Sequence, residues 1–542
     1  MNLSKIESSF KPTSDKKCSN AKHGMVATAF PDATKAGISI LKKGGNAIDA
    51  ACAAALALGV CEPQASGIGG QSMVILHYEG KTIAIDGSSR SPSLAHSSIF
   101  KKKFNRTLGY KATTVPSTLA VLGHLIEKYG RLDWATIIKP AIKIAKEGYR
   151  ITNLQHSLQK RELENFMKIK SHSGATYFLK DGETPYEVGD LFVQDDLSEL
   201  LSYISKHSWR TFYHGEIAKK IDKDMRKHKG LLREEDLALI PELIERESIN
   251  RRYREVEVRT MPPPAAGRTL LLVLMMLNHM PSKFLRSGKP LAYHFVAETF
   301  RKAFYHRVLK PFNPHTYLQV KDKTHLQRHF AKQLADSIQS KMDETLPFTD
   351  DEFGGEDTTH LSVMDDEGNA IGITQSIELV YGSKAAAEDL GFLYNSYMNA
   401  FEFKNPNHPY YIRPNNIPWT SVSPAIIFRN GKLWMVLGSP GSSRIFSSIS
   451  QFLSRVIDGE LPMNEAIKRP RFHCSVGGTI SLEIDGFKKE VVDYLKKLNY
   501  KIDPKERYSY FHGAIHAVMK CHTKKMFQGV AEVRRDGTAE GF

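Results

Sequence analysis

Two adjacent threonines follow a glycine-rich, acidic segment of the chain. Residues 354–359 read GGEDTT, so a flexible stretch leads directly to Thr358 and Thr359. One chemistry requires this arrangement: a threonine hydroxyl attacks the carbonyl carbon before it, the acyl group shifts from nitrogen to oxygen, and water cleaves the ester. The freed threonine then has a hydroxyl nucleophile and its own α-amine as a base of near-neutral pKa. The competing interpretation is an ordinary strand start, since β-branched residues favour strands.

The residues after this junction have the pattern of a β-hairpin. Segments 358–364 and 370–377 alternate between apolar and polar residues, with a turn between them. If the turn is centred near Glu367, Thr358 lies opposite Ser376. A hydroxyl at that place would orient the threonine amine or relay a proton, whereas a register slip of one residue would turn it to the other face of the sheet.

A glycine-rich turn is the second candidate for a chemical role. Residues 438–443 read GSPGSS and lead into an amphipathic helical pattern over 444–457. Backbone of this kind ahead of a helix presents free N–H groups, which suit the stabilisation of an oxyanion. The competing interpretation is a tight strand-to-helix turn without a chemical role, and the spacing alone does not choose between the two.

Other patterns predict the elements that would position these residues. Asn46 is placed to begin an apolar helix over 47–60, and a helix that is apolar nearly all round is normally buried. Strands are predicted over 72–78 and 81–86. Residues 116–345 have mostly helical periodicity, whereas strand patterns dominate after the threonine junction.

Composition limits the class of protein. The chain has 542 residues, of which 41% are hydrophobic, so a large core can be buried and disorder is excluded as the main state. Residues 1–23 are expected to form a disordered or loosely docked tail, and the acidic stretch 346–357 a flexible linker. The net charge of +16 is spread along the chain, so no nucleic-acid partner is expected.

Motifs for cofactors and for membrane insertion are missing from the sequence. It has no Walker A loop and no HExxH, and its five cysteines form no CxxC pair, so neither a metal nor another cofactor is expected. The most apolar stretches, 50–61 and 269–277, are shorter than the ~20 residues that span a bilayer. The N-terminus lacks the apolar region of a secretory signal, so we expect a cytoplasmic protein with no membrane partner.

Several blocks of the sequence resemble the γ-glutamyltranspeptidase family of N-terminal-nucleophile hydrolases. In chain order they are GMVAT at 24–28, ILKKGGNAIDAA at 40–51, EPQASGIGG at 62–70, DTTHLSVMDDEGNA at 357–370, YGS at 381–383, SPA at 423–425, GSPGSSR at 438–444 and RPRFH at 469–473. The resemblance implies an α+β fold, a four-layer αββα sandwich. It also implies that the precursor cuts itself between Asp357 and Thr358. The large subunit, 24–357, and the small subunit, 358–542, would stay intertwined as a heterodimer, and such heterodimers could pair.

The resemblance also implies roles for residues of the reaction centre. Thr358 matches the family nucleophile, and Ser376 matches a threonine near it, at the position that the hairpin register indicates. Gly441 and Ser442 match a pair of glycines whose backbone N–H groups form the oxyanion hole. A serine is tolerable there if its φ is allowed, because the backbone does the work.

The residues implied for the substrate carboxylate depart from the family pattern. Thr420 and Ser421 match two serines that hold the α-carboxylate of the substrate. The family arginine for this group falls on Ser88, and the nearest arginine is Arg90, in the sequence DGSSRSP. This DGSxRxP form resembles a divergent branch of acylases and amidohydrolases.

The residues implied for the substrate ammonium depart further. The family holds this group with Asn, Gln and Asp, and the matching positions here are Glu378, Tyr397 and Ala400. A buried ammonium without a carboxylate is costly, so the loss of the Asp weakens this subsite. Glu378 could supply the missing charge from a different strand.

Three functions remain open at this point. The first is a γ-glutamyl hydrolase or transferase that acts on glutathione-like compounds through a γ-glutamyl-enzyme ester, with water or an amino group as acceptor. The second is an amidase or acylase for another acidic amide, such as poly-γ-glutamate, a glutaryl compound or a small dicarboxylic monoamide. The third is an unprocessed, non-enzymatic homologue. The intact Thr358 and Ser376 argue against the third.

Overall fold

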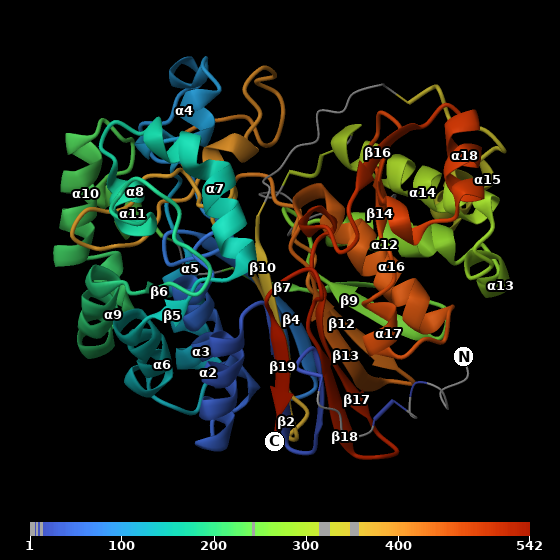
Figure 1. The fold of residues 1–542 in the computed structure, drawn as a ribbon, viewed down its shortest axis with the longest axis horizontal. Coiled ribbons are helices and arrows are strands. Elements are labelled where there is room, and N and C mark those ends of the chain that lie inside the picture. Colours follow the sequence, from blue (N-terminus) through green and yellow to red (C-terminus); the bar gives the residue numbers. More distant parts are fainter. Residues whose placement is uncertain are drawn as a thin grey trace.

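Two seven-stranded antiparallel sheets lie face to face in the middle of the molecule (Figure 1). The computed structural model describes residues 6, 9–10, 15–240, 244–309, 311–313, 326–346 and 357–542. One sheet has the order β1 (Cys18–Ala21), β18 (Met526–Val530), β17 (His516–Cys521), β13 (Lys432–Gly438), β12 (Ala425–Arg429), β9 (Val256–Thr260) and β8 (Ile249–Tyr253). The other has the order β19 (Thr538–Gly541), β2 (Gly24–Thr28), β10 (Thr359–Asp365), β11 (Ala370–Ser376), β3 (Gln71–Tyr78), β4 (Lys81–Gly87) and β7 (Ile244–Glu247).

Helices cover the outer face of each sheet (Figure 1). Beside the sheet of β10 lie α2 (Pro31–Lys42), α3 (Ala47–Cys61), α5 (Thr118–Tyr129), α6 (Trp134–Glu147), α7 (Asn153–Met167), α8 (Ser173–Phe178), α9 (Asp195–His207), α10 (Glu216–Lys227) and α11 (Glu234–Ala238). Beside the sheet of β13 lie α12 (Gly267–Leu277), α13 (Ser282–Leu285), α14 (Pro290–Leu309), α15 (Arg328–Asp336), α16 (Ile445–Ile457), α17 (Met463–Ala466) and α18 (Lys489–Lys497). The predicted four-layer αββα sandwich of the α+β class is confirmed.

Smaller elements decorate the helical layers. They are α4 (Phe104–Thr107), the two-stranded sheet of β5 (Tyr149–Arg150) and β6 (Leu191–Phe192), and the three-stranded sheet of β14 (Phe472–Cys474), β15 (Thr479–Glu483) and β16 (Lys501–Lys505). Within the described residues, no helix combines the length and the apolar character needed to cross a bilayer.

Helix α3 supports the sheet that carries the threonine junction. Asn46 caps it as predicted, since its side chain accepts the N–H groups of Ile48 at 2.9 Å and Asp49 at 3.0 Å. The Asp49 carboxylate in turn accepts the Asn46 N–H at 3.0 Å, which completes a capping box. Nearly every residue of α3 is buried, and the helix packs on β10 and β11.

Strands from both sides of the threonine junction are interleaved in one sheet. β10 and β11, which follow the junction, lie between β2 and β3, which precede it. The two parts of the chain therefore share one core. Within the described residues, a cut before Thr358 would leave them joined by five strand-to-strand ladders, which are β2–β10, β3–β11, β2–β19, β1–β18 and β9–β12. This arrangement accounts physically for the intertwined subunits that the resemblance implies.

The N-terminal boundary of the folded region lies earlier than predicted. We expected residues 1–23 to be a disordered or loosely docked tail, but β1 pairs with β18, from Cys18 opposite Val530 to Ala21 opposite Phe527. The edge of β18 offers unpaired backbone groups, and both end residues of β1 are buried. Parts of the expected tail, and most of the expected linker 346–357, lie outside the described residues.

Candidate active site

The peptide bond before Thr358 is surrounded by hydroxyl groups. Thr358 Oγ1 donates a hydrogen bond to the carbonyl oxygen of Asp357 at 2.6 Å, and Ser376 Oγ donates to the same oxygen at 2.9 Å. The two hydroxyl oxygens lie 3.3 Å apart. All three residues are buried. Two hydroxyl groups thus converge on one carbonyl group in a site shielded from bulk water.

The hairpin register places these hydroxyls together. β10 pairs with β11 so that Thr359 lies opposite Gln375, which confirms the predicted register and puts Thr358 next to Ser376. Ser376 Oγ also accepts the N–H of Glu378 at 2.8 Å, and the N–H of Asp357 donates to the carbonyl oxygen of Glu378 at 3.1 Å. The chain on both sides of the junction is therefore held by backbone and side-chain bonds.

A buried ionic cluster that the sequence analysis missed holds the Asp357 side chain. Arg535 Nη2 lies 3.0 Å from Asp357 Oδ1, and Arg535 Nη1 lies 3.8 Å from Glu62 Oε1. The same guanidinium lies 3.6 Å from the ring centroid of Tyr510. Burial raises the pKa of Asp357, and it raises the pKa of Glu62 to about 8 against the opposing effect of Arg535. Glu62 belongs to the block EPQASGIGG, but no local pattern pointed to Arg535.

The Asp357 carboxylate also contacts the nitrogen that would leave on cleavage. The amide N–H of Thr358 donates to Asp357 Oδ1 at 2.9 Å. Arg535 binds the same oxygen, so the orientation of the carboxylate is fixed from two sides. Hydrogen bonds thus hold the carbonyl oxygen of Asp357, the nitrogen of Thr358 and the side chain of Asp357.

The glycine-rich turn has left-handed backbone at both positions predicted for the oxyanion hole. It follows β13 and opens a short 3₁₀ helix, Ser442–Arg444, which leads into α16. Gly441 has a φ of +121° and Ser442 a φ of +53°, so both lie in the left-handed region. A non-glycine residue can adopt the φ of Ser442 at a small energetic cost, so a serine is compatible with this position of the turn. Gly438, at the end of β13, is so close to His360 of β10 that a Cβ would lie 2.4 Å from its ring.

The residues predicted for the substrate ammonium lie beside the hydroxyl pair. Glu378 is buried two residues after Ser376 and has a φ of +79°. Burial and then the Glu378 carboxylate raise the pKa of Tyr397, whose hydroxyl also interacts with Ser376. Tyr397 and Ala400 belong to one 3₁₀ helix, Tyr397–Ala400. The structure therefore brings this predicted set together around Ser376.

The residues predicted for the substrate carboxylate fall into two groups that have different contacts. Thr420 and Ser421 are buried, and Arg307 of α14 contacts both: Nη2 lies 2.5 Å from the Thr420 carbonyl oxygen and Nη1 lies 3.4 Å from Ser421 Oγ. Arg90 is partly exposed, and its Nη1 donates to the carbonyl oxygen of Asn415 at 3.3 Å. Sequence reasoning missed Arg307 because it lies within a helix, more than a hundred residues before its partners.

One set of side chains among the described residues has the spacing of metal ligands. Asp224, His228 and Glu388 bring their ligand atoms within 4.8 Å of one another. They already contact one another or protein neighbours, since Tyr394 donates to Asp224 at 2.8 Å and His228 Nε2 lies 2.8 Å from Glu388 Oε1. These contacts explain the cluster structurally: it is a hydrogen-bonded link between α10 and the loop of Glu388.

Comparison with known proteins places this geometry in a family. The sequence model described as gamma-glutamyltranspeptidase matches residues 33–542. A glutathione hydrolase proenzyme of Escherichia coli (strain K12) is 32% identical over 90% of this chain and 87% of its own length. An acylase ACY 1 proenzyme of Pseudomonas sp. (strain SE83) is 30% identical over 87% of this chain and 86% of its own length.

A solved structure agrees over almost the whole fold. The crystal structure of cephalosporin acylase from Bacillus halodurans superposes with a TM-score of 0.88 at 26% identity, and it covers 98% of each chain. The resemblance inferred from the sequence blocks is confirmed by these matches. The chain therefore belongs to the gamma-glutamyltranspeptidase family of enzymes.

Proposed function

We propose that this chain cuts itself between Asp357 and Thr358 and then works as an N-terminal-threonine amidohydrolase or acyltransferase. The observation that carries the proposal is the pair of hydroxyls from Thr358 and Ser376 on the Asp357 carbonyl oxygen, at 2.6 and 2.9 Å. A nucleophile beside a carbonyl group needs a donor on the oxygen where negative charge develops. Ser376 is placed to be that donor.

Self-cleavage follows from this geometry in balanced steps. Thr358 Oγ1 attacks the carbonyl carbon of Asp357, and the hydroxyl proton is transferred to the Thr358 nitrogen as the C–N bond breaks. The product is an ester between Asp357 and Thr358 Oγ1 with a free Thr358 amine. Water then hydrolyses the ester, which leaves a carboxyl group on Asp357 and restores the hydroxyl of Thr358.

The mature reaction repeats this chemistry on a substrate. The Thr358 amine takes the proton of Oγ1, which attacks the carbonyl carbon of the substrate amide. The same proton then passes to the substrate nitrogen as its C–N bond breaks, so that an amine leaves and the acyl group stays on Oγ1 as an ester. Backbone N–H groups of Gly441 and Ser442 stabilise the tetrahedral intermediate, a role supported by their left-handed backbone ahead of α16. Water or an amino acceptor then releases the acyl group.

The first candidate acyl group is γ-glutamyl. Arg90, Thr420 and Ser421 would hold its carboxylate, and Glu378 with Tyr397 would hold its ammonium. The burial of Glu378 beside Tyr397 and Ser376 supports a charged partner for an amine close to the nucleophile. Glutathione-like compounds carry this acyl group, and the glutathione hydrolase relatives support the assignment.

The second candidate is an acidic acyl group without the amine. Ala400 replaces a carboxylate that the family uses for the ammonium. The acylase relative covers 87% of this chain against 90% for the Escherichia coli hydrolase, and the cephalosporin acylase structure covers 98%. An amidase for glutaryl compounds, poly-γ-glutamate or another dicarboxylic monoamide would use the carboxylate residues alone.

A two-step experiment tests the proposal. Mass spectrometry of the purified protein should find a new N-terminus at Thr358, and both fragments should elute together on size exclusion because their strands are interleaved. The cleaved protein is then assayed on γ-glutamyl and glutaryl p-nitroanilides, with and without an amino acceptor. An uncleaved chain that turns over neither compound would establish the non-enzymatic homologue instead.

A further inference from the structure

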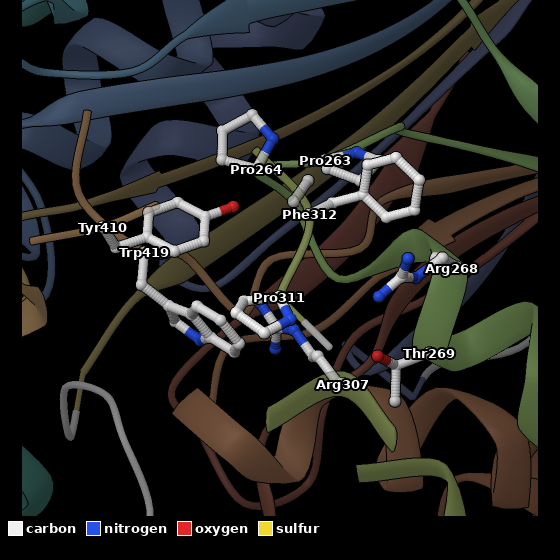
Figure 2. Close-up of a pocket in the computed structure, with 10 residues that line it drawn as sticks. Pro263, Pro264, Arg268, Thr269, Arg307, Pro311, Phe312, Tyr410 and Trp419 are labelled. Atoms are coloured by element: carbon white, nitrogen blue, oxygen red, sulfur yellow. The ribbon is translucent and has the colours of Figure 1, made fainter. Parts of the chain in front are cut away.

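A small cavity lies beside the residues predicted for the substrate carboxylate (Figure 2). Its lining comes from distant parts of the chain and includes Pro263, Arg268, Arg307, Tyr410 and Trp419. Arg307 projects from the C-terminal part of α14 and contacts the carbonyl of Thr420 and the hydroxyl of Ser421, as described above. The cavity therefore joins a guanidinium to the pair that the family resemblance links to carboxylate binding.

Arg307 differs from most of the other buried arginines in its electrostatic environment. Five of them each have a carboxylate oxygen within 3.0 Å; these are Arg246, Arg301, Arg471, Arg534 and Arg535. In the described part of the chain, Arg307 has no carboxylate partner and instead lies 4.1 Å from the ring centroid of Trp419. A guanidinium that is 94% buried without a counter-charge is costly, so the fold retains a positive charge here at the expense of stability.

The charge on Arg307 persists at neutral pH. Burial lowers the pKa of Arg307 to about 9, and the like charge of Arg268 in the same cavity acts in the same direction. Because about 9 is still well above 7, the guanidinium remains predominantly protonated. An anion that approached Thr420 and Ser421 would supply the missing negative charge.

The cavity is also connected to the reaction centre. Tyr397, Ala400, Tyr410 and Trp419 form one buried cluster, and the backbone N–H of Trp419 donates to the carbonyl oxygen of Ala400 at 3.1 Å. Tyr397 at one part of this cluster interacts with Ser376, and Trp419 at another stacks on Arg307. The cluster therefore links the hydroxyl pair to Arg307 through side chains in direct contact.

We propose that Arg307 is a specificity-determining positioning residue that orients Thr420 and Ser421 and supplies the positive charge for a carboxylate on the acyl group. The inference rests on the proposed function and deepens it, because it restricts the acyl group to one that bears a carboxylate. Arg90, which is partly exposed and bonded to Asn415, would then serve at the edge of the site. The charge is worth roughly ten- to a hundredfold in affinity, as for a charge-assisted hydrogen bond in a shielded pocket.

The test compares two acyl donors that differ only in charge. Glutaryl p-nitroanilide carries the carboxylate, and its terminal-amide analogue is neutral and of similar shape. Arg307→Met should raise KM for the glutaryl compound roughly ten- to a hundredfold, with little change in kcat and a much smaller change in KM for the neutral analogue. Arg307→Lys keeps the charge and should recover part of the loss. Complete self-cleavage and a melting temperature no lower than that of the wild type establish that each variant is folded.

A binding measurement separates this inference from the proposed function. Calorimetry with glutarate on the cleaved protein should show binding by the wild type and none by Arg307→Met at the same concentration. Binding that survives the substitution, or equal losses on the charged and neutral anilides, would overturn the inference even if the enzyme is active. Failure of the wild type to bind glutarate would overturn it as well. Absence of turnover with retained, Arg307-dependent binding would instead contradict the proposed function alone.

If Arg307→Met does not fold, Ser421→Ala provides the second variant. It removes the hydroxyl that lies 3.4 Å from Arg307 Nη1 and leaves the buried charge in place. Discrimination between the two anilides should then fall, again through KM. Full discrimination in a processed Ser421→Ala protein would contradict the positioning role.

Discussion

Thr358 Oγ1 and Ser376 Oγ lie 3.3 Å apart and direct hydrogen bonds to one acceptor, the carbonyl oxygen of Asp357. In the proposed self-cleavage, the two hydroxyls have different roles. Thr358 can attack the carbonyl carbon, whereas Ser376 can stabilise the oxygen as charge develops on it. The consequences can be tested separately for the two residues.

Thr358→Ala should abolish self-cleavage. The variant lacks the attacking hydroxyl, so it should remain a single chain of 61.0 kDa without amidase activity. Denaturing electrophoresis and intact-mass measurement show the outcome. Thr358→Ser retains a hydroxyl and should still be cut. An alanine variant that is cut at the same bond would exclude the proposed nucleophile.

Ser376→Ala should slow self-cleavage without abolishing it. The lost donor to the Asp357 carbonyl oxygen is worth a factor of ~10²–10³, the usual cost of removing one oxyanion donor. The rate of appearance of the small fragment after purification measures this effect. Ser376→Thr keeps the hydroxyl and should be cleaved at close to the wild-type rate, so equal slowing in both variants would indicate a packing defect instead.

Gly441→Ala should lower kcat of the cleaved enzyme by ~10²–10³, the usual cost of one lost oxyanion donor. The reason is that the turn must move to accommodate the added methyl group. A Cβ at this position would lie 2.9 Å from the Cα of Gly513, and the φ of +121° disfavours any side chain. Ser442→Gly is the matched control, since glycine adopts the φ of +53° without strain, and its kcat should stay near the wild-type value. Proline at 442 is unsuitable because its φ is fixed near −65°. A normal kcat for processed Gly441→Ala would remove this turn from the mechanism.

Glu62 should make the precursor less stable as the pH rises. Burial raises the pKa of Glu62 to about 8, against ~4.3 for an unperturbed glutamate, so between these values the folded chain holds a proton that the unfolded chain has lost. Stability should therefore fall from about pH 4.3 to pH 8. In the uncut Thr358→Ala background, Glu62→Gln should flatten this slope in thermal melts, whereas Glu147→Gln, at an exposed site, should not. The same slope with and without Glu62 would mean that this carboxyl is ionised in the folded chain.

Glu378→Gln should discriminate between the two candidate acyl groups. The substitution keeps the size of the side chain and removes the charge proposed for an ammonium. Turnover of γ-glutamyl p-nitroanilide should fall, and turnover of the glutaryl compound should stay nearly unchanged. Equal losses on both would assign Glu378 a structural role. Faster wild-type turnover of the glutaryl compound would favour the acylase function.

Local pattern was sufficient for the elements that carry the nucleophile. The alternation of 358–364 and 370–377 gave the correct hairpin register, because a strand repeats every two residues and a slip would have buried the wrong face. The capped, apolar helix α3 was predictable for a similar reason, since its cap and its apolar surface are local properties. Family blocks then supplied roles for these positions.

The charged groups around the junction depended on the tertiary structure. Arg535 reaches Asp357 from 178 positions along the chain, and Arg307 reaches Thr420 from 113 positions away. No periodicity or local motif encodes such a pairing, because it depends on how whole strands and helices pack. The burial that raises the pKa of Glu62 is likewise a property of the assembled core, and so is the lack of a carboxylate partner for Arg307 among the described residues. The sequence by itself thus determined the fold class, the family and the pairing of the Thr358 and Ser376 hydroxyls, whereas the packing of distant segments decided which charges surround them.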